Sequence, residues 1–566
     1  MTAIPPAASA NIARHLETMA ATQPHAAALK VPRGRTATGA IDYLTLTFAE
    51  LATEVAGWRA HLRAKGVVTG DRVLVMVRQG LPLIASVFAL FSLGAIPIVI
   101  DPGMGRRRFL ECVRRSRPRV LLGIPVAQVL SHLFRRAFNT VEVRVHVSGN
   151  ALHRIATDGA AHANLEIVPR AARDLAAILF TSGSTGAPKG VCYEHGMFEA
   201  QVTMIRDTYG ITPGEIDLPM LPVFALFNPA LGLTTIVPEI DPSRPATVDP
   251  RKIVQAIQQE QVTNTFGSPT LWLKIAQHCR DHAITLPSLR RVLSAGAPVP
   301  PALWTAMSQI LPNGELHSPY GATEALPVST IAAREVLAGT ADATRTGAGT
   351  CVGHIVPPNE VRIIPITDTA LASLQDLPLL PAGEIGEIIV RGPTVTQLYD
   401  ALPEATARAK IPADAGEAAD TRNWHRLGDA GYRDDSGRLW FCGRIAERVV
   451  LEDGTSLFPD QVEPLFNSHP SIRRTALIAV GPTDRQQAGL VIEPTNTRTV
   501  RSDAARRALA AELCQLARDH RHASRVHLFY FHPNLPVDVR HNAKIHRLAL
   551  ARWAASVTGY DSGGPD

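Results

Sequence analysis

Alternation of apolar helices and apolar strands is the main pattern in the first two thirds of the chain. In "LTFAELATEVAGWRAHLRAKGV" a helix is expected to begin near Thr47 and to stop at Gly66. The apolar residues of that helix fall on one side, at Phe48, Leu51, Val55 and Leu62. The β-rich "RVLVMV" follows at once, and the alternation recurs through "AAILFTSGS", "VTNTFGSPTLW" and "RRVLSAGAPV". This pattern predicts an α/β fold, with parallel sheets covered by helices on both faces.

A second, smaller unit is expected at the C-terminal end, because 566 residues are more than one hydrophobic core usually serves. The alternation loosens between Ile364 and Trp424. After "FCGRIAERVV" a new α+β pattern starts with "LFPDQVEPLFNSHPSIRRTALIAVG" and ends in a helix around residues 548–553. We therefore predict a large N-terminal domain, residues 1–443, and a small α+β C-terminal domain, residues 444–566.

The segment "LPLIASVFALFSLGAIPIVI", residues 81–100, carries no charge and is long enough to cross a bilayer. Gly94 and Pro97 divide it into a helix and a β-rich "AIPIVI", which favours a buried α/β core over a transmembrane span. The N-terminal "MTAIPPAASANIARHLETM" is not a secretory signal, because no basic stretch precedes an apolar core. The six cysteines are widely spaced without a CxxC pair, which indicates neither disulfides nor a zinc site. We expect a cytoplasmic protein.

The formal charge of +6 does not indicate nucleic-acid binding, because only seven of the 57 basic residues are lysines and the arginines are scattered. The densest basic run is "GRRRFLECVRRSRPR", residues 105–119. It predicts an amphipathic helix with a solvated face, and no aromatic residues alternate with its arginines. A weak contact of this helix with a membrane or a protein surface is the alternative interpretation.

The stretch "LFTSGSTGAPKGV", residues 179–191, is the strongest chemical signal. An apolar strand end leads into a Gly/Ser/Thr loop whose N–H groups and hydroxyls suit a polyphosphate, and Lys189 adds a positive charge. It is not the P-loop of nucleotide hydrolases, because Pro188 and Gly190 stand where that motif needs glycine and Ser/Thr. The loop therefore predicts a different kind of phosphate site.

"FTSGSTGAPKG" resembles the phosphate-binding signature of the AMP-forming adenylating enzymes, the superfamily of acyl-CoA synthetases, peptide-synthetase adenylation domains and luciferases. "LSAGAPV" (293–299) is similar to the adenine-side loop of this family, and "SPYGATE" (318–324) to its tyrosine–glycine–x–threonine–glutamate motif. "GEIGEIIVRGP", "LGDAGYRDDSGRLWFCGR" and "AKIHR" resemble the later motifs, in family order. The resemblance covers residues 11–553 and implies an adenylating N-terminal domain with a mobile C-terminal lid domain.

The resemblance implies that ATP and Mg²⁺ are bound, and it assigns residues to each part of the nucleotide. The β- and γ-phosphates would be held by Thr181, Ser182, Gly183, Ser184, Thr185 and Lys189. The adenine would lie against Tyr320 and the adjoining Gly321, with Gly296, Ala297 and Pro298 along the base. The ribose would be contacted by Asp429 and Arg444.

Three residues are implied as catalytic. Thr323 would contact the α-phosphate, and Glu324 would hold the magnesium ion as a hard oxygen ligand. Lys544, in the C-terminal domain, would bridge the substrate carboxylate and the α-phosphate during adenylation. No residue is assigned as the base of a second step, for which His425 and His541 are weak candidates.

The sequence departs from the family pattern at positions linked to domain rotation and to thiol access. They are Ala225, Leu427, Ala446, Val450 and Ala543. The adenylating half-reaction therefore looks intact and the thioester-forming half looks altered, so a hydroxyl of the same substrate becomes a candidate nucleophile. "LPMLPVFALFNPALG" and "DVRHNAKIHR" resemble the β-lactone synthetases of bacterial long-chain olefin biosynthesis.

That resemblance implies adenylation of a long-chain 2-alkyl-3-hydroxy fatty acid, then attack of the 3-hydroxyl to give a β-lactone, AMP and pyrophosphate. Other enzymes of an olefin pathway would be its partners. The apolar "PVFALFNPALGLTTIVP" is consistent with an alkyl channel, and equally with an ordinary buried segment. Two alternative functions stay open: a long-chain acyl-CoA synthetase or acyl-AMP ligase, and a non-catalytic nucleotide-binding scaffold subunit.

Replacement of Lys544 tests the implied adenylation chemistry. Lys544→Ala should abolish ATP-dependent AMP release while leaving ATP binding largely in place, because only the bridge between carboxylate and α-phosphate is lost. AMP release and ATP affinity are measured on the same preparation. AMP release at the wild-type rate would refute the assignment.

Overall fold

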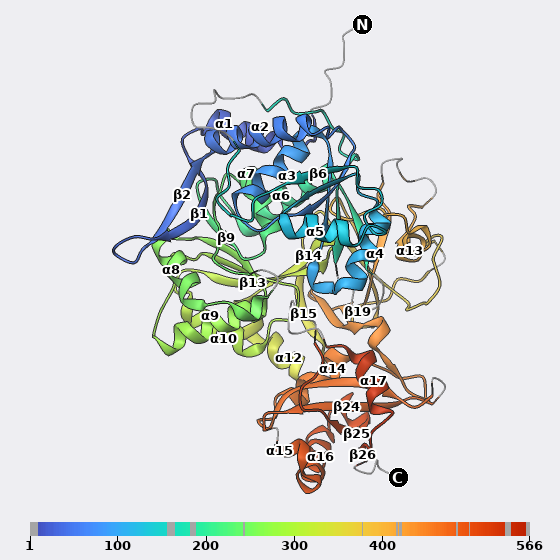
Figure 1. The fold of residues 1–566 in the computed structure, drawn as a ribbon. Helices are drawn as coiled ribbons and strands as arrows, with labels where there is room; N and C mark the ends of the chain where they lie inside the picture. Colours follow the sequence, from blue (N-terminus) through green and yellow to red (C-terminus); the bar gives the residue numbers. More distant parts are fainter. Residues whose placement is uncertain are drawn as a thin grey trace.

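The computed structural model describes residues 9–155, 165–181, 188–241, 244–375, 377–414, 417, 421–482, 485–496, 498–537 and 545–561. The chain up to the end of strand β20 at Arg444 forms a large body around two sheets, and the residues after it form a smaller body beside it (Figure 1). The fold is α/β, as the alternation of helices and strands predicted.

The first sheet has six strands, in the order β6-β5-β3-β4-β7-β8. All neighbours in it run parallel except β8, which is antiparallel to β7. Its strands are β3 (Arg72–Met76), β4 (Ile96–Ile100), β5 (Val120–Gly123), β6 (Val143–His146), β7 (Leu175–Thr181) and β8 (Lys189–Glu194). Helices pack around it, among them α2 (Phe48–Ala64), α3 (Leu81–Leu93), α4 (Arg106–Ser116), α5 (Pro125–Leu133) and α6 (His195–Tyr209).

The three helices expected from the sequence near this sheet, α2, α3 and α4, are confirmed. Helix α2 begins after Thr47, whose hydroxyl accepts from the Glu50 N–H while the Glu50 carboxylate accepts from the Thr47 N–H. Segment 81–100 splits into α3 and β4 at Gly94, where φ is 67°. Nearly all of α3 is buried. No helix in the described ranges is both long enough and apolar enough to cross a bilayer.

The second sheet is larger and mixed, and its central strands β13-β12-β11-β9-β10-β1 run parallel. These strands are β1 (Ala27–Arg35), β9 (Ile216–Pro219), β10 (Thr234–Ile236), β11 (Asn264–Gly267), β12 (Arg291–Ser294) and β13 (Glu315–Ala322). Antiparallel strands extend both ends: β2 (Ile41–Thr47), β14 (Ala325–Ala332), β15 (Thr350–Ile355), β16 (Glu360–Ile364), β17 (Gly386–Arg391), β18 (Lys410–Ile411), β19 (Trp424–Arg433) and β20 (Leu439–Arg444).

Further helices accompany the large body. They are α1 (Arg14–Thr22), α7 (Asn228–Leu231), α8 (Pro250–Glu260), α9 (Pro269–Asp281), α10 (Pro301–Ile310), α11 (Ala333–Glu335), α12 (Ala341–Arg345) and α13 (Pro403–Ala409). Helices α8, α9 and α10 bury apolar faces in one core with the parallel strands, around Trp272 and Trp304. A separate core fills the space between α2, α3 and the first sheet, around Trp58 and Phe88.

The smaller body has its own core, around Phe466, Leu513 and Phe529. It contains the sheet β23 (Ile472–Val480), β24 (Gln487–Pro494), β25 (Val526–Phe531) and β26 (Tyr560–Asp561), and the pair β21 (Val449–Val450) and β22 (Ser456–Leu457). Its helices are α14 (Pro459–Asn467), α15 (Arg498–Arg501), α16 (Asp503–Ala517) and α17 (Arg547–Ala554). The predicted boundary between residues 443 and 444 falls at the end of β20 and stays a prediction.

Candidate functional site

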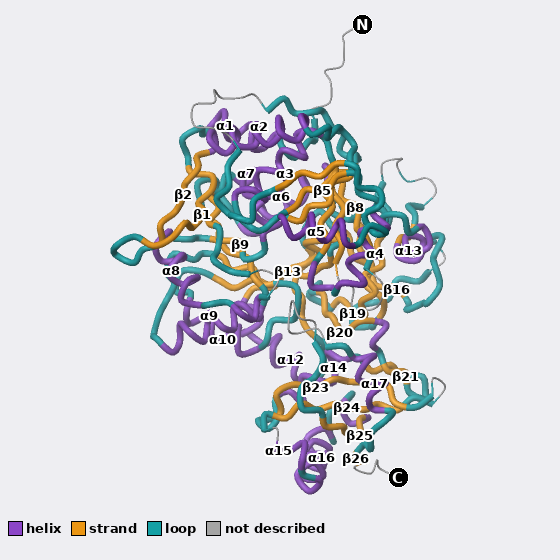
Figure 2. Tube along the Cα trace, in the orientation of Figure 1, coloured by secondary structure: helices purple, strands orange, loops and turns teal. Residues whose placement is uncertain are grey.

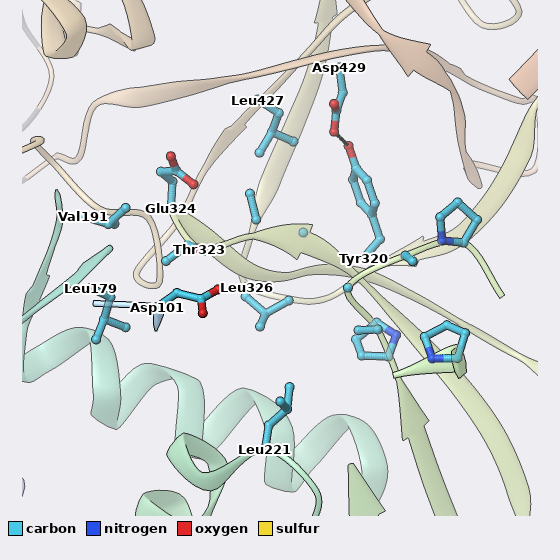
Figure 3. A pocket seen from close by; sticks show the side chains of 18 of the residues that line it. Asp101, Leu179, Val191, Leu221, Tyr320, Thr323, Glu324, Leu326, Leu427 and Asp429 are labelled. Atoms are coloured by element: carbon cyan, nitrogen blue, oxygen red, sulfur yellow. Dashed lines mark hydrogen bonds between the residues drawn. The ribbon is translucent and has the colours of Figure 1, made fainter. Parts of the chain in front are cut away.

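A cavity of about 2740 Å³ lies between the two sheets and extends to the smaller body. Strands β11, β12 and β13 are parallel, so the loops that follow them emerge at one edge of the sheet. Residues 295–301, after β12, and residues 318–324, at the end of β13, line the cavity from this edge. Asp101 and Leu179 face it from the first sheet (Figure 3). The topology thus brings together motifs that are far apart in the sequence.

Asp429 joins Tyr320 and Arg444 in a buried polar cluster. Asp429 on β19 and Arg444 on β20 are cross-strand partners, and Arg444 Nη1 lies 2.7 Å from Asp429 Oδ1. Tyr320 Oη donates to Asp429 Oδ2 at 2.5 Å, as Figure 3 shows. Burial and the Asp429 charge hold the pKa of Tyr320 well above its usual value, so the phenol stays protonated. Arg444 also donates to the carbonyl of Leu427, at 3.0 Å.

Glu324 and Lys189 meet at the ring of Tyr399. Tyr399 Oη donates to Glu324 Oε1 at 2.7 Å, and Lys189 Nζ lies 4.7 Å from the centre of the Tyr399 ring. Burial and the Glu324 charge raise the pKa of Tyr399. The backbone at Thr323 is fixed by Tyr193, whose Oη donates to the Thr323 carbonyl at 2.5 Å. A carboxylate and an ammonium group therefore approach the cavity from two different sheets.

Of the other residues predicted to bind the nucleotide, some line the cavity and some lie outside the described residues. Gly296, Ala297, Pro298 and Gly321 line the cavity together with Tyr320 and Thr323. Most of the glycine loop lies outside the described residues, including Ser182, Gly183, Ser184 and Thr185. The side chain of Thr181 is not described either. Thr181 and Lys189 pair across β7 and β8, so the two ends of the loop lie side by side. The assignment of the loop stays a prediction.

Lys544 and His541 also lie outside the described residues, but the chain that follows them is held firmly. Arg547 donates to both carboxylate oxygens of Glu463, at 3.0 and 2.8 Å, and to Glu447 at 2.9 Å. Ile545 and Arg547 line the same cavity as Glu324. Glu447 belongs to the short helix Ile445–Glu447 directly after β20, so this ion pair links the strand that carries Arg444 with the segment after Lys544.

The departures from the family pattern fall at defined places in the structure. Ala446 is in the helix Ile445–Glu447 and lines the cavity with a methyl group. Val450 is in β21, and Leu427 is a buried residue of β19 beside the Asp429 cluster. Ala225 is buried in the 3₁₀ helix Pro222–Phe227, and Ala543 lies outside the described residues.

Stacked phenylalanine rings, here called the phenylalanine wall, line another part of the cavity that contains Tyr320. Phe198 of α6 stacks on Phe227 at a ring distance of 4.7 Å, and Phe224 stacks on Phe266 at 3.9 Å. Residues 221–224, 226 and 227, within the apolar stretch singled out in the sequence, all line the cavity, and α3 adds Leu83 to the same lining. The cavity therefore joins a charged end at Asp429 and Glu324 to an apolar end.

Three residues near the site were missed by the sequence analysis: Tyr193 and Tyr399, which line the cavity, and Lys410, which is buried close enough to Glu324 to be affected by its charge. None lies in a segment with a recognisable chemical pattern, and the only signal at Lys410 is a lysine in a chain with seven. Lys410 Nζ is buried and donates to Thr396 Oγ1 at 3.2 Å. Burial lowers the pKa of Lys410 to about 7, against an opposing contribution from Glu324.

His425, opposite Lys410 in the β18–β19 pair, is buried and is one of the residues that line the cavity. Its Nδ1 lies 3.1 Å from the carbonyl of Ala409. Burial and the neighbouring Lys410 hold the pKa of His425 well below its usual value, so the imidazole is neutral. A neutral imidazole can accept a proton, but its enclosure does not by itself place a substrate hydroxyl beside it.

Comparison with known proteins shows the family to which the chain belongs. The family described as AMP-binding enzyme matches residues 16–400. An olefin beta-lactone synthetase of Xanthomonas campestris pv. campestris is 44% identical over 96% of this chain and 97% of its own, and one of Stenotrophomonas maltophilia is 42% identical over 96% and 98%. Among solved structures, ATP-bound MatB from Rhodopseudomonas palustris shares the fold, with a TM-score of 0.74 and 21% identity over 97% of this chain and 99% of MatB.

The buried lysine makes stability depend on pH. Because the pKa of Lys410 falls from 10.5 to about 7 on folding, the unfolded chain binds the extra proton between these values, and stability rises with pH across that window. The free energy of unfolding of the wild type should therefore rise relative to Lys410→Met from pH 7 to pH 9.5, by at most about 1.4 kcal/mol per pH unit. Urea unfolding at several pH values measures the difference.

Lys65→Met, which removes an exposed lysine, is the matched control for this experiment. A difference between the wild type and Lys410→Met that stays constant from pH 7 to pH 9.5 would contradict the burial of a neutralised lysine.

Proposed function

Because this chain belongs to the family of AMP-binding enzymes, and within it to the group of the olefin beta-lactone synthetases, we propose that it converts a long-chain 2-alkyl-3-hydroxy fatty acid into a β-lactone, with ATP cleaved to AMP and pyrophosphate. The chain is an AMP-forming ligase. The acid, the lactone product and the residue roles below are the proposal. The observation that carries it is a single cavity that joins the Tyr320–Asp429–Arg444 cluster to a wall of stacked phenylalanines.

Adenylation needs a nucleotide held with its α-phosphorus beside the substrate carboxylate. A carboxylate oxygen attacks that phosphorus, the bond to the β-phosphate oxygen breaks, and pyrophosphate leaves with the electron pair. We assign Asp429 to the ribose hydroxyls, because a buried carboxylate oriented by Arg444 accepts such bonds strongly. Tyr320, fixed by its own bond to Asp429, would present its ring to the adenine. Lys189 and Lys544 would neutralise the charge that builds up on the phosphates.

The residues present fit a magnesium ion shared with the phosphates. Glu324 faces the cavity as a hard oxygen donor, and Tyr399 fixes one of its oxygens. In the described part of the chain, no group of three or more His, Cys, Asp or Glu side chains could hold a metal alone. Mg²⁺ is commonly bound in this way, by one or two carboxylates and substrate phosphates. When bound, it would neutralise charge on the leaving pyrophosphate.

Ring closure would follow within the same acyl-adenylate. The oxygen of the 3-hydroxyl attacks the acyl carbon, the bond from that carbon to the AMP oxygen breaks, AMP leaves with the electron pair, and the hydroxyl proton passes to water. An internal nucleophile has a high effective concentration and needs no second substrate. The methyl side chain of Ala446 and the small side chain of Ala225 agree with a site that no longer depends on a thiol acceptor.

Product analysis tests the function directly. The protein is incubated with Mg²⁺, ATP and a synthetic 2-alkyl-3-hydroxy acid, with and without CoA, and the products are identified by NMR. We expect a β-lactone and AMP in equal amounts whether or not CoA is present. A thioester that forms only with CoA would establish the acyl-CoA synthetase alternative, and no AMP release would establish the scaffold alternative.

Removal of the proposed magnesium ligand should lower the rate of AMP release while leaving the protein folded. Glu324→Ala should lower Mg²⁺-dependent AMP release by at least about a hundredfold, because a carboxylate beside the leaving group is lost. Glu404→Ala, on the exposed first turn of nearby α13, is the matched control. AMP release and its Mg²⁺ dependence are measured for both variants. A Glu324→Ala enzyme with wild-type turnover would refute the assignment.

A further inference from the structure

Helix α5 presents an apolar stripe to solvent. Val126, Val129 and Leu133 are spaced to lie on one side of the helix, and they are 56, 64 and 69% exposed. Val129 and Leu133 are the two most exposed large apolar residues in the described part of the chain. The opposite side of α5 is buried, and Gln128 there donates to the carbonyls of Gly123 and Val145. The stripe is therefore not needed to hold the helix on the sheet.

Arginines surround this stripe on the neighbouring helix and just beyond α5. Helices α4 and α5 lie next to each other at the surface (Figure 1), and the Arg106 guanidinium lies 5.9 Å from the centre of the Phe134 ring. Residues 105–136 contain nine arginines and one carboxylate, Glu111, which pairs with Arg115. Seven of these arginines are exposed and make no ion pair with a described residue: Arg106, Arg107, Arg108, Arg114, Arg117, Arg135 and Arg136.

The stripe also lies at an entrance to the large cavity. Ile124, Val126 and Ala127, at the start of α5, line that cavity together with Phe109 of α4. Val99 of β4, 40% exposed, lines it as well. The exposed stripe of α5 thus adjoins the cavity lining at Val126. Arg115, at the same edge, donates to the carbonyl of Pro188, directly after the glycine loop.

We propose that the outer face of α4 and α5 docks this protein on an anionic lipid bilayer, with Val126, Val129 and Leu133 inserted among the acyl chains and the surrounding arginines on the lipid headgroups. An exposed apolar stripe between unpaired arginines is what an interfacial surface requires, because insertion and charge attraction add. A nucleic acid fits less well, since the exposed core of the face is aliphatic. The inference extends the proposed function, because a two-chain fatty acid is dissolved in membranes and would enter the cavity from this side.

Binding to vesicles tests the docking face without using catalysis. The full chain is sedimented with vesicles of phosphatidylglycerol and phosphatidylcholine in equal parts, and with vesicles of phosphatidylcholine alone. We expect binding to the anionic vesicles that falls steeply in about 1 M salt, where the Debye length is ~3 Å. Equal binding to both kinds of vesicle, or none to either, would overturn the proposal.

Two variants separate the two contributions to this binding. Val129→Gln with Leu133→Gln should weaken vesicle binding at least about tenfold, because two inserted side chains become polar. Replacement of Arg107, Arg108, Arg135 and Arg136 by Gln should weaken it at least about a hundredfold and remove the preference for anionic lipid. Binding that survives both variants unchanged would contradict the assigned face.

A matched control changes the same residue types elsewhere. Leu516→Gln with Arg498→Gln and Arg501→Gln removes an exposed leucine of α16 and two exposed arginines of α15, and should bind as the wild type does. AMP release with a short, water-soluble 3-hydroxy acid and no vesicles should be the same in all variants, which shows that folding and the site are intact. If the protein binds anionic vesicles but makes no lactone, the proposed function is refuted and the docking face is still supported.

Discussion

The buried carboxylate of Asp429 is the interaction on which the site depends most. Register places it opposite Arg444 on the next strand, and the phenol of Tyr320 donates a hydrogen bond to its other oxygen from another strand of the same sheet. A buried charge of this kind is tolerated only when it is paired, and removal of one partner typically costs about 3–5 kcal/mol. Arg444 is also the last residue of β20, so the cluster fixes the point from which the chain leaves for the smaller body.

A second balance of charge operates around Glu324. Lys189 contributes a positive charge from β8, and Lys410, whose pKa burial lowers to about 7, contributes only part of one at neutral pH. Tyr399 and His425 stay neutral because burial disfavours their charged forms. Burial brings the pKa of Lys410 to about 7, so the net charge around Glu324 depends on the packing of β18 against β19. The same cluster thus connects the pH dependence of stability with the charge around Glu324.

The chemistry and the surface of the molecule agree with one kind of substrate. The charged end of the cavity suits a nucleotide and a carboxylate, and the phenylalanine wall suits alkyl chains. Val126 of the exposed stripe on α5 lines the same cavity, and arginines border that stripe. A protein that takes a water-insoluble acid from a lipid phase would need each of these features, and all of them adjoin one cavity.

The sequence by itself determined the alternating α/β pattern, α2 with its Thr47 cap, the division of residues 81–100 at Gly94, and the family, because these depend on local periodicity and on short motifs. The motif residues Tyr320, Glu324, Asp429 and Arg444 were also named from it. Only the tertiary structure decided that Tyr193, Tyr399 and Lys410 support the site, and that the stripe on α5 stays exposed. Their roles come from contacts between distant strands and from burial, which residue spacing along one chain does not encode.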